Sequence, residues 1–237
     1  MLLLLSLPLF ADPLSGTQCA SYSDAYKSSV IMHNAYHSTS SSLENEGGLA
    51  LWKRFLKEED ESQLLILAHL IVQRESKDLP NDYRGEFLWA IAPAALVSAK
   101  KNRIFPSVVL AQGILESGWG TSSLARNHNN LFGVKGKKGK SSTKVYTIES
   151  VGGKKVRRWA YFRHFSSWSD SISYHGRLLG SSHYYAFAKP IAKDARHYLE
   201  LIAPRYASQP DYAEYVVQII DEYNLDRWDR ILWDSLL

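Results

Sequence analysis

A single acidic residue in an apolar helix constrains this chain more than any other feature. The segment from Phe105 to Gly136 reads FPSVVLAQGILESGWGTSSLARNHNNLFGVKG. Pro106 suits the first turn of a helix, Gly118 suits a left-handed C-cap, and the apolar residues between them recur at helical spacing. Glu116 therefore falls in the last turn. Burying a carboxylate costs free energy, so the pattern predicts either a chemical role for Glu116 or a helix end that turns it to solvent.

The surroundings of Glu116 predict a raised pKa. Desolvation and the negative end of the helix dipole both disfavour the charged carboxylate. A carboxylic acid that stays protonated near neutral pH is what glycosidic cleavage requires of its general acid. Glycosidases usually carry a second group across the scissile bond, and Glu149, at the end of a predicted strand, is one candidate. The alternative for Glu149 is a solvated turn residue facing nearby lysines.

Polar and aromatic residues follow the acid closely. Asn129 and Asn130 are suited to hydrogen-bond acetamido or hydroxyl groups of a sugar, or to form an Asx turn. Trp119 and Phe132 are suited to stack on a pyranose ring, or to close the core beneath the loop. The eight His residues show no metal-binding spacing, and phosphate-binding glycine loops and serine-nucleophile motifs are absent from the sequence. We therefore expect no metal and no cofactor.

The rest of the chain predicts a mostly helical α+β fold. Two amphipathic helices are expected between residues 49 and 71, separated by the acidic run 58–61. A helix over 86–101 contains Pro93, which predicts a kink or a restart. A hairpin is expected from strands 143–149 and 155–165, with its turn at Gly152–Gly153. Later helices are predicted over 168–180 and, beginning at Pro190 and at Pro210, over the two segments that follow.

The charge of the chain and its targeting signals limit the partners that it can have. Its 237 residues carry a formal charge of +4 and a pI of about 9.0, which suits an anionic partner such as nucleic acid, a membrane surface or an acidic wall polymer. The basic residues around 135–158 predict a solvated face or a site for an anionic glycan or nucleic acid. The single cysteine, Cys19, allows no intramolecular disulfide. We see no run of about 18 apolar residues that would span a membrane.

The first eleven residues, MLLLLSLPLFA, resemble the apolar region and cleavage site of an export signal, although the basic start is missing; a buried apolar helix is the alternative. The predicted organisation is therefore a signal remnant over 1–11, a helical or loop extension of unassigned role over 12–84, and a catalytic domain over 85–237.

Several segments of the sequence resemble those of a known enzyme family. The segments IAPAA, FPSVVLAQGILESGWGTSSLA and NNLFGVKG, followed by YTIES and RYASQPDYAEYVVQIIDEYNL, resemble glycoside hydrolase family 73, the N-acetylglucosaminidases of bacterial cell-wall hydrolases. The resemblance covers about residues 85–229. It implies a lysozyme-like domain with a small β-hairpin lobe over a substrate groove. It also implies secretion or a place in the bacterial cell envelope.

The resemblance further implies an endo-β-N-acetylglucosaminidase that cleaves the β-1,4 bond after N-acetylglucosamine in peptidoglycan glycan strands. Glu116 matches the family's catalytic acid, Glu149 matches its β-lobe acidic residue, and Tyr206 matches a tyrosine near the acid. The sequence departs from the family pattern at Gln209, where an Asp is common, which affects the geometry of that loop. Whether the enzyme retains, inverts or uses the substrate's own acetamido oxygen stays open.

Three other functions compete with this one. A muramidase or lytic transglycosylase would cut the same polymer on a related fold. A non-catalytic glycan-binding module would keep the groove, although the presence of both Glu116 and Glu149 argues against it. A basic nucleic-acid binder is a third class, and no sequence-specific nucleic-acid motif is found for it.

Overall fold

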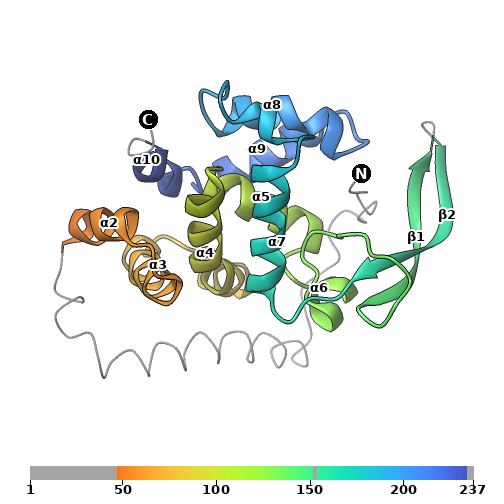
Figure 1. Cartoon of the computed structure of the whole chain (residues 1–237), viewed down its shortest axis with the longest axis horizontal. Helices are drawn as coiled ribbons and strands as arrows, with labels where there is room; N and C mark the ends of the chain where they lie inside the picture. The colour runs from red at the N-terminus through yellow and green to blue at the C-terminus, as the bar shows by residue number, and fades with distance from the viewer. Residues whose placement is uncertain (1–46, 152–153, 234–237) are drawn as a thin grey trace.

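The computed structural model describes residues 47–151 and 154–233 (Figure 1). Over these residues the fold is mostly helical with one small two-stranded sheet, as the sequence predicts. The expected export signal, the remainder of the extension before residue 47 and the turn at Gly152–Gly153 lie outside the described residues. The elements are α2 (Gly48–Lys57), α3 (Glu61–Glu75), α4 (Tyr83–Asn102), α5 (Pro106–Ser117), α6 (Ser123–His128), β1 (Ser142–Val151), β2 (Lys154–Arg163), α7 (Trp168–Ser181), the 3-10 turn η1 (Ala186–Ala188), α8 (Ala195–Tyr206), α9 (Tyr212–Glu222) and α10 (Arg227–Trp233).

Helix α5 lies in the middle of the helical body, where it packs against α4, α7, α8, α9 and α10 (Figure 1). Every residue of α5 except Leu115 is buried, because its sequence is apolar on all sides. Pro106 occupies the first turn, and Gly118 closes the helix at φ +57° and ψ +55°, as expected. Both carboxylate oxygens of Asp229 from α10 accept hydrogen bonds from Ser107, one from its amide and one from its hydroxyl. The start of α5 is therefore held by the C-terminal part of the described chain.

Helices α4 and α7 approach closely at two glycines of α7. A Cβ on Gly176 would lie 1.9 Å from Ser98 Oγ, and one on Gly180 would lie 2.7 Å from the carbonyl oxygen of Asn102. Pro93 lies inside α4, which runs as one helix through it, so the predicted restart is wrong. The proline is buried among α4's packing partners, and this tertiary packing offsets the lost backbone hydrogen bond.

The two helices α2 and α3 form where the sequence predicts them. Asp60 caps α3 by accepting a hydrogen bond from the Gln63 amide. Trp52 and Phe55 of α2 are fully buried and belong to the same hydrophobic core as the residues of α4 and α5. The described part of the extension is thus continuous with the helical body.

The later helices begin at aspartates rather than at the predicted prolines. Asp194 caps α8 by accepting from the His197 amide, and α9 starts after Asp211. A proline restricts its own φ, whereas an N-cap satisfies an amide that would otherwise lack a partner. Pro190 instead lies in a turn.

The hairpin of β1 and β2 extends away from the helices (Figure 1). Its register places Tyr146 opposite Trp159 and Val145 opposite Ala160. One face packs on α6, where Ala160, Phe162 and Val145 cluster with Leu124. On the other face, Tyr146 and Trp159 are 55% and 58% exposed. The hairpin therefore has one apolar face on the body and one aromatic face in solvent.

Candidate active site

Glu116 lies in the last turn of α5 with its side chain almost entirely enclosed. It keeps only 7% of its exposed area, and its Oε1 accepts a hydrogen bond from the Tyr212 hydroxyl at 3.1 Å. Burial raises the pKa of Glu116 to about 8, while the bond from Tyr212 acts in the opposite direction. The group is therefore mostly a neutral carboxylic acid at neutral pH, as its place in the helix predicts.

A line of hydrogen bonds runs behind the acid. His175 Nε2 lies 2.9 Å from Gln112 Oε1, and Gln112 Nε2 donates to the Tyr212 oxygen at 3.1 Å. Burial lowers the pKa of His175 to about 3, so its ring is neutral. Since an amide oxygen can only accept, the neutral ring carries its proton on Nε2 and donates it to Gln112.

The direction of this line decides where the proton of Glu116 resides. Tyr212 accepts from Gln112, so its own hydroxyl hydrogen points to Glu116 Oε1. Within the described residues, Oε2 has no hydrogen-bond partner. A neutral acid whose Oε1 accepts carries its proton on Oε2. The arrangement therefore leaves the acidic proton on the oxygen that no side chain occupies.

Tyr206, the tyrosine selected from the sequence, lies behind Tyr212. The two rings are nearly parallel, with centroids 5.2 Å apart and an interplanar angle of 27°. The Tyr206 hydroxyl is buried and has no hydrogen-bond partner in the described part of the chain. Burial, followed by the nearby charge of Glu116, raises its pKa well above the ordinary value. In this structure Tyr206 packs behind the tyrosine that holds the acid.

Three consecutive left-handed residues follow the acid. Gly118, Trp119 and Gly120 have φ values of +57°, +59° and +72°. A left-handed conformation is strained for tryptophan, and such strain persists where the surroundings fix it. The Trp119 ring is half-buried, with edge contacts to Phe87 at 6.0 Å and Tyr223 at 4.8 Å. The ring thus packs between α4 and the end of α9.

The asparagine pair builds the loop. Asn130 is 1% exposed; its Nδ2 donates to the carbonyls of Val134 and Arg163, and its Oδ1 accepts from the Val134 amide. Asn129 is partly exposed, and its Nδ2 donates to the carbonyls of Phe165 and Ser166. The amide of Asn130 is fully used by the backbone, so its predicted contact with a sugar is corrected to a structural role.

Phe132 is a core residue. It is fully buried and stacks on His175, with ring centroids 3.8 Å apart and an angle of 6°. A pyranose cannot reach either of its faces, so its predicted stacking role is corrected as well. Phe132 instead fixes the histidine at the far end of the hydrogen-bonded line.

Glu149 lies in β1, where it pairs with Val156 and follows the buried Thr147 by two residues. Its side chain lies outside the described residues. Its role as the second group stays a prediction.

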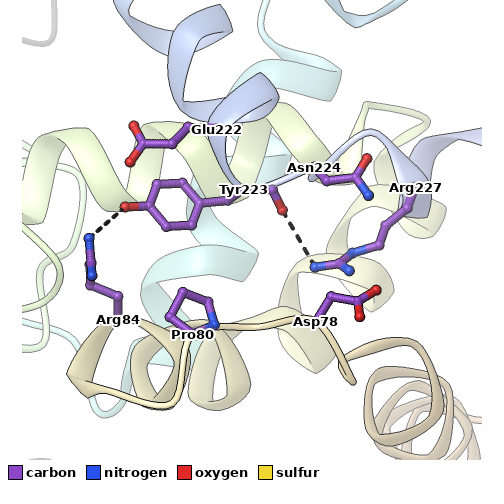
Figure 2. Close-up of a pocket in the computed structure, with 7 residues that line it drawn as sticks. All are labelled: Asp78, Pro80, Arg84, Glu222, Tyr223, Asn224 and Arg227. Carbon is purple, nitrogen blue, oxygen red and sulfur yellow. Dashed lines mark hydrogen bonds between the residues drawn. The ribbon is translucent and has the colours of Figure 1, made fainter.

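A separate cavity of about 300 Å³ lies between the segment before α4 and the α9–α10 connection (Figure 2). Arg84 donates to the Tyr223 hydroxyl, and Arg227 donates to the Tyr223 carbonyl. Asp78 and Glu222 add two carboxylates to its wall. Glu116 does not line this cavity.

Sequence reasoning missed three members of the site. Tyr212 and His175 lie in segments with an apolar helical pattern, where an aromatic side chain usually means core. Gln112 carried a local signal, because a polar residue four positions before Glu116 shares its face of the helix. Within residues 47–151 and 154–233 we find neither a cluster of metal-ligating side chains nor a helix with the length and apolar character to cross a bilayer.

Comparison with known proteins identifies the family of this chain. Residues 92–225, more than half of the chain, match the Glucosaminidase family model, described as mannosyl-glycoprotein endo-beta-N-acetylglucosaminidase. The catalytic domain of the autolysin Auto from Listeria monocytogenes superposes with a TM-score of 0.57 at 30% identity, over 66% of this chain and 93% of that one. The helical body with its hairpin and buried acid defines a lysozyme-like glycoside hydrolase domain. The chain belongs to the Glucosaminidase family, glycoside hydrolase family 73.

Two curated relatives extend the comparison. The exo-glucosaminidase LytG of Bacillus subtilis is 34% identical over 166 residues, which are 68% of this chain and 58% of LytG. A probable N-acetylmuramidase of Lactococcus lactis subsp. cremoris is 37% identical over 152 residues, 60% of this chain and 34% of that protein. This chain thus spans only part of the length of each relative.

Proposed function

We propose that this protein is an extracytoplasmic bacterial peptidoglycan hydrolase that cleaves the β-1,4 bond after N-acetylglucosamine, with Glu116 as general acid. The observation that carries the proposal is the buried carboxyl of Glu116, which Tyr212 holds at Oε1 and whose Oε2 has no hydrogen-bond partner among the described residues; burial raises its pKa to about 8, which favours the protonated acid. Family membership supports the reaction class. The names of the relatives, exo-glucosaminidase and autolysin among them, support a cell-wall substrate.

The proton on Oε2 is the one that the reaction needs. As the bond between the anomeric carbon and the glycosidic oxygen breaks, the bonding pair stays on the oxygen and Oε2 gives up its proton to it. A water molecule then forms a bond to the anomeric carbon and loses a proton. In our proposal Glu149 accepts that proton or supports attack by the acetamido oxygen of the substrate. Tyr212 keeps its bond to Oε1 and stabilises the carboxylate that forms.

The roles of the other residues follow from their contacts. Gln112 and His175 act as positioning residues, because they reach Glu116 only through Tyr212. Tyr206 supports Tyr212 by stacking. Of the residues proposed for substrate contact, half-buried Trp119 and partly exposed Asn129 keep exposed surface.

The test is mass spectrometry of muropeptides released from purified peptidoglycan. We expect products that end in reducing N-acetylglucosamine. Products that end in reducing N-acetylmuramic acid would show that the protein is a muramidase, the activity in the name of the Lactococcus relative. Products that end in the anhydro sugar would show that it is a lytic transglycosylase. Release of single sugars rather than longer fragments would indicate exo rather than endo cleavage.

A further inference from the structure

The charge of this chain is concentrated in one segment. Residues 135–163 hold ten Lys or Arg residues and one acidic residue, Glu149, so the segment carries +9 while the whole chain carries +4. The remainder therefore carries −5, and the basic pI arises from the hairpin and the loop before it. Such segregation gives the hairpin lobe a positive field that the rest of the molecule does not share.

The outer face of the hairpin, defined here as Lys144, Tyr146, Arg157 and Trp159, combines this charge with exposed rings. Tyr146 and Trp159 face each other across the strands with centroids 5.2 Å apart, and Lys144 Nζ lies 5.1 Å from the Trp159 ring centre. The apolar contact of the hairpin with α6 uses the opposite face. The aromatic pair is thus not needed to close the core.

Five exposed cations of this region have no carboxylate partner among the described residues. Lys144 and Arg157 are exposed, and so are Lys137, Lys138 and Lys140 in the loop before β1. The described residues include no carboxylate that pairs with any of these five. The Ser142 hydroxyl donates to the carbonyl of Lys137, which folds this loop over the start of the hairpin. The outer face therefore combines two exposed rings with Lys144 and Arg157, and the loop before β1 adds three more exposed lysines.

We propose that the outer face of the hairpin binds an anionic, phosphate-bearing sugar polymer of the bacterial wall. Exposed rings suit the apolar faces of sugars, and the lysines and arginine suit phosphate groups along the polymer. The outer face is distinct from Glu116, so this contact would hold the protein on the wall without occupying the catalytic carboxyl. The choice of a wall polymer rests on the function proposed above; the binding surface itself does not.

Binding can be measured separately from hydrolysis. Sedimentation with purified walls would use the full chain carrying Glu116→Gln, so that the walls stay intact, and would compare native walls with walls stripped of their phosphate polymer. We expect binding to native walls to weaken about tenfold in the double variant Tyr146→Ala/Trp159→Ala, a change of about 1.4 kcal/mol. We expect little difference between the variant and its parent on stripped walls. The matched control is Tyr184→Ala/Tyr215→Ala, which removes two exposed rings from elsewhere on the surface.

A second pair of variants tests the charges. Lys144→Gln/Arg157→Gln should weaken binding and flatten its dependence on salt, because exposed charges are screened within about 8 Å at physiological ionic strength. Lys53→Gln/Lys193→Gln, which removes two exposed lysines outside the basic segment, should change little.

Three results would overturn the proposal. Equal binding to native and stripped walls would exclude the phosphate polymer as the ligand. Normal binding by the aromatic variant would show that the rings serve only to pair the strands. If duplex DNA competed for binding as well as the soluble polymer does at equal phosphate concentration, the surface would be only a general anion site. Absence of muropeptide release, by contrast, would refute the hydrolase and leave the binding result standing.

Discussion

Tyr212 holds one oxygen of Glu116, and the other oxygen has no partner within residues 47–151 and 154–233. The hydroxyl donates to Oε1 at 3.1 Å, and the same hydroxyl accepts from Gln112, so its hydrogen has a single direction. A neutral acid in this setting presents its proton on Oε2. The orientation of the Glu116 carboxyl, the general acid in our proposal, is therefore set by a tyrosine on α9, 96 residues further along the chain.

Glu116→Gln should remove activity while stabilising the fold at alkaline pH. Loss of a general acid costs about 10²- to 10⁴-fold in rate, and glutamine keeps an oxygen for Tyr212. The pKa of Glu116 rises from 4.5 in the unfolded chain to about 8 in the fold. Between these values the folded protein holds a proton that the unfolded chain has released, so this contribution to stability falls as pH rises and is fully lost above pH 8.

The stability test is chemical denaturation at pH 4.5 and pH 8.5. The variant should gain on the wild type between these pH values, at about 1.4 kcal/mol for each pH unit over which the protonation states differ. Glu200→Gln, at an exposed position on α8, is the control and should show no such trend. Full activity in a folded Glu116→Gln protein would refute the role of the acid.

Tyr212→Phe should move the alkaline limb of the activity profile to higher pH. The wild type should lose activity as pH rises through about 8, because the proton leaves Glu116. The Tyr212 bond lowers that pKa, so its removal raises it further. We also expect kcat to fall about tenfold or more, since Oε1 loses its donor.

Tyr206→Phe is the matched comparison for this prediction. It removes a buried hydroxyl that has no hydrogen-bond partner within the described residues, so the alkaline limb should stay in place. Stability should be unchanged or higher by about 1 kcal/mol. If the alkaline limb moved in Tyr206→Phe and not in Tyr212→Phe, Tyr206 rather than Tyr212 would be the residue that holds Glu116.

Trp52→Ala should destabilise the whole domain and not only the N-terminal helices. The Trp52 ring is 1% exposed within the core shared with α4 and α5, and such truncations cost about 3–5 kcal/mol. Thermal unfolding should show one transition at a lower temperature. Leu49→Ala is the control, since Leu49 lies on the same helix and is 63% exposed. Two separate transitions would mean that α2 and α3 form an independent unit.

Gly180→Ala should separate α7 from α4. Its new methyl group would lie 2.7 Å from the Asn102 carbonyl, a backbone atom that cannot rotate away. Overpacking of this kind costs about 1–3 kcal/mol. Gly139→Ala, where the closest atom is 3.9 Å away, should be neutral in the same denaturation experiment. Unchanged stability of Gly180→Ala would show that the two helices can shift apart freely.

Features with a local cause could be predicted from the sequence. Pro106 and Gly118 mark the ends of α5, and of the two alternatives that the apolar stretch leaves open for Glu116, burial and exposure to solvent, the structure shows burial. The hairpin strands follow from residue alternation. The starts of α8 and α9 were misplaced because prolines were given more weight than the neighbouring aspartates, of which Asp194 makes a capping hydrogen bond.

The rest of the site depends on contacts between distant segments. A tyrosine in an apolar helix face looks the same whether it fills a core or holds an acid, so Tyr212 gave no distinguishing signal. Asn130 and Phe132 show the converse, because residues suited to bind a sugar are equally suited to build a loop and a core. Only the fold separates these roles, because it uses both polar side-chain atoms of Asn130 in the loop and buries Phe132 against His175.

The long separation between Glu116 and Tyr212 also affects when the protein can work. At roughly 5 to 20 residues per second, a ribosome needs about 5 to 20 s to add the 96 residues between them. During that interval the nascent chain already contains its acid but lacks the phenol that orients it. The hydrogen bond between Glu116 and Tyr212 can therefore form only after most of the helical body has been synthesised.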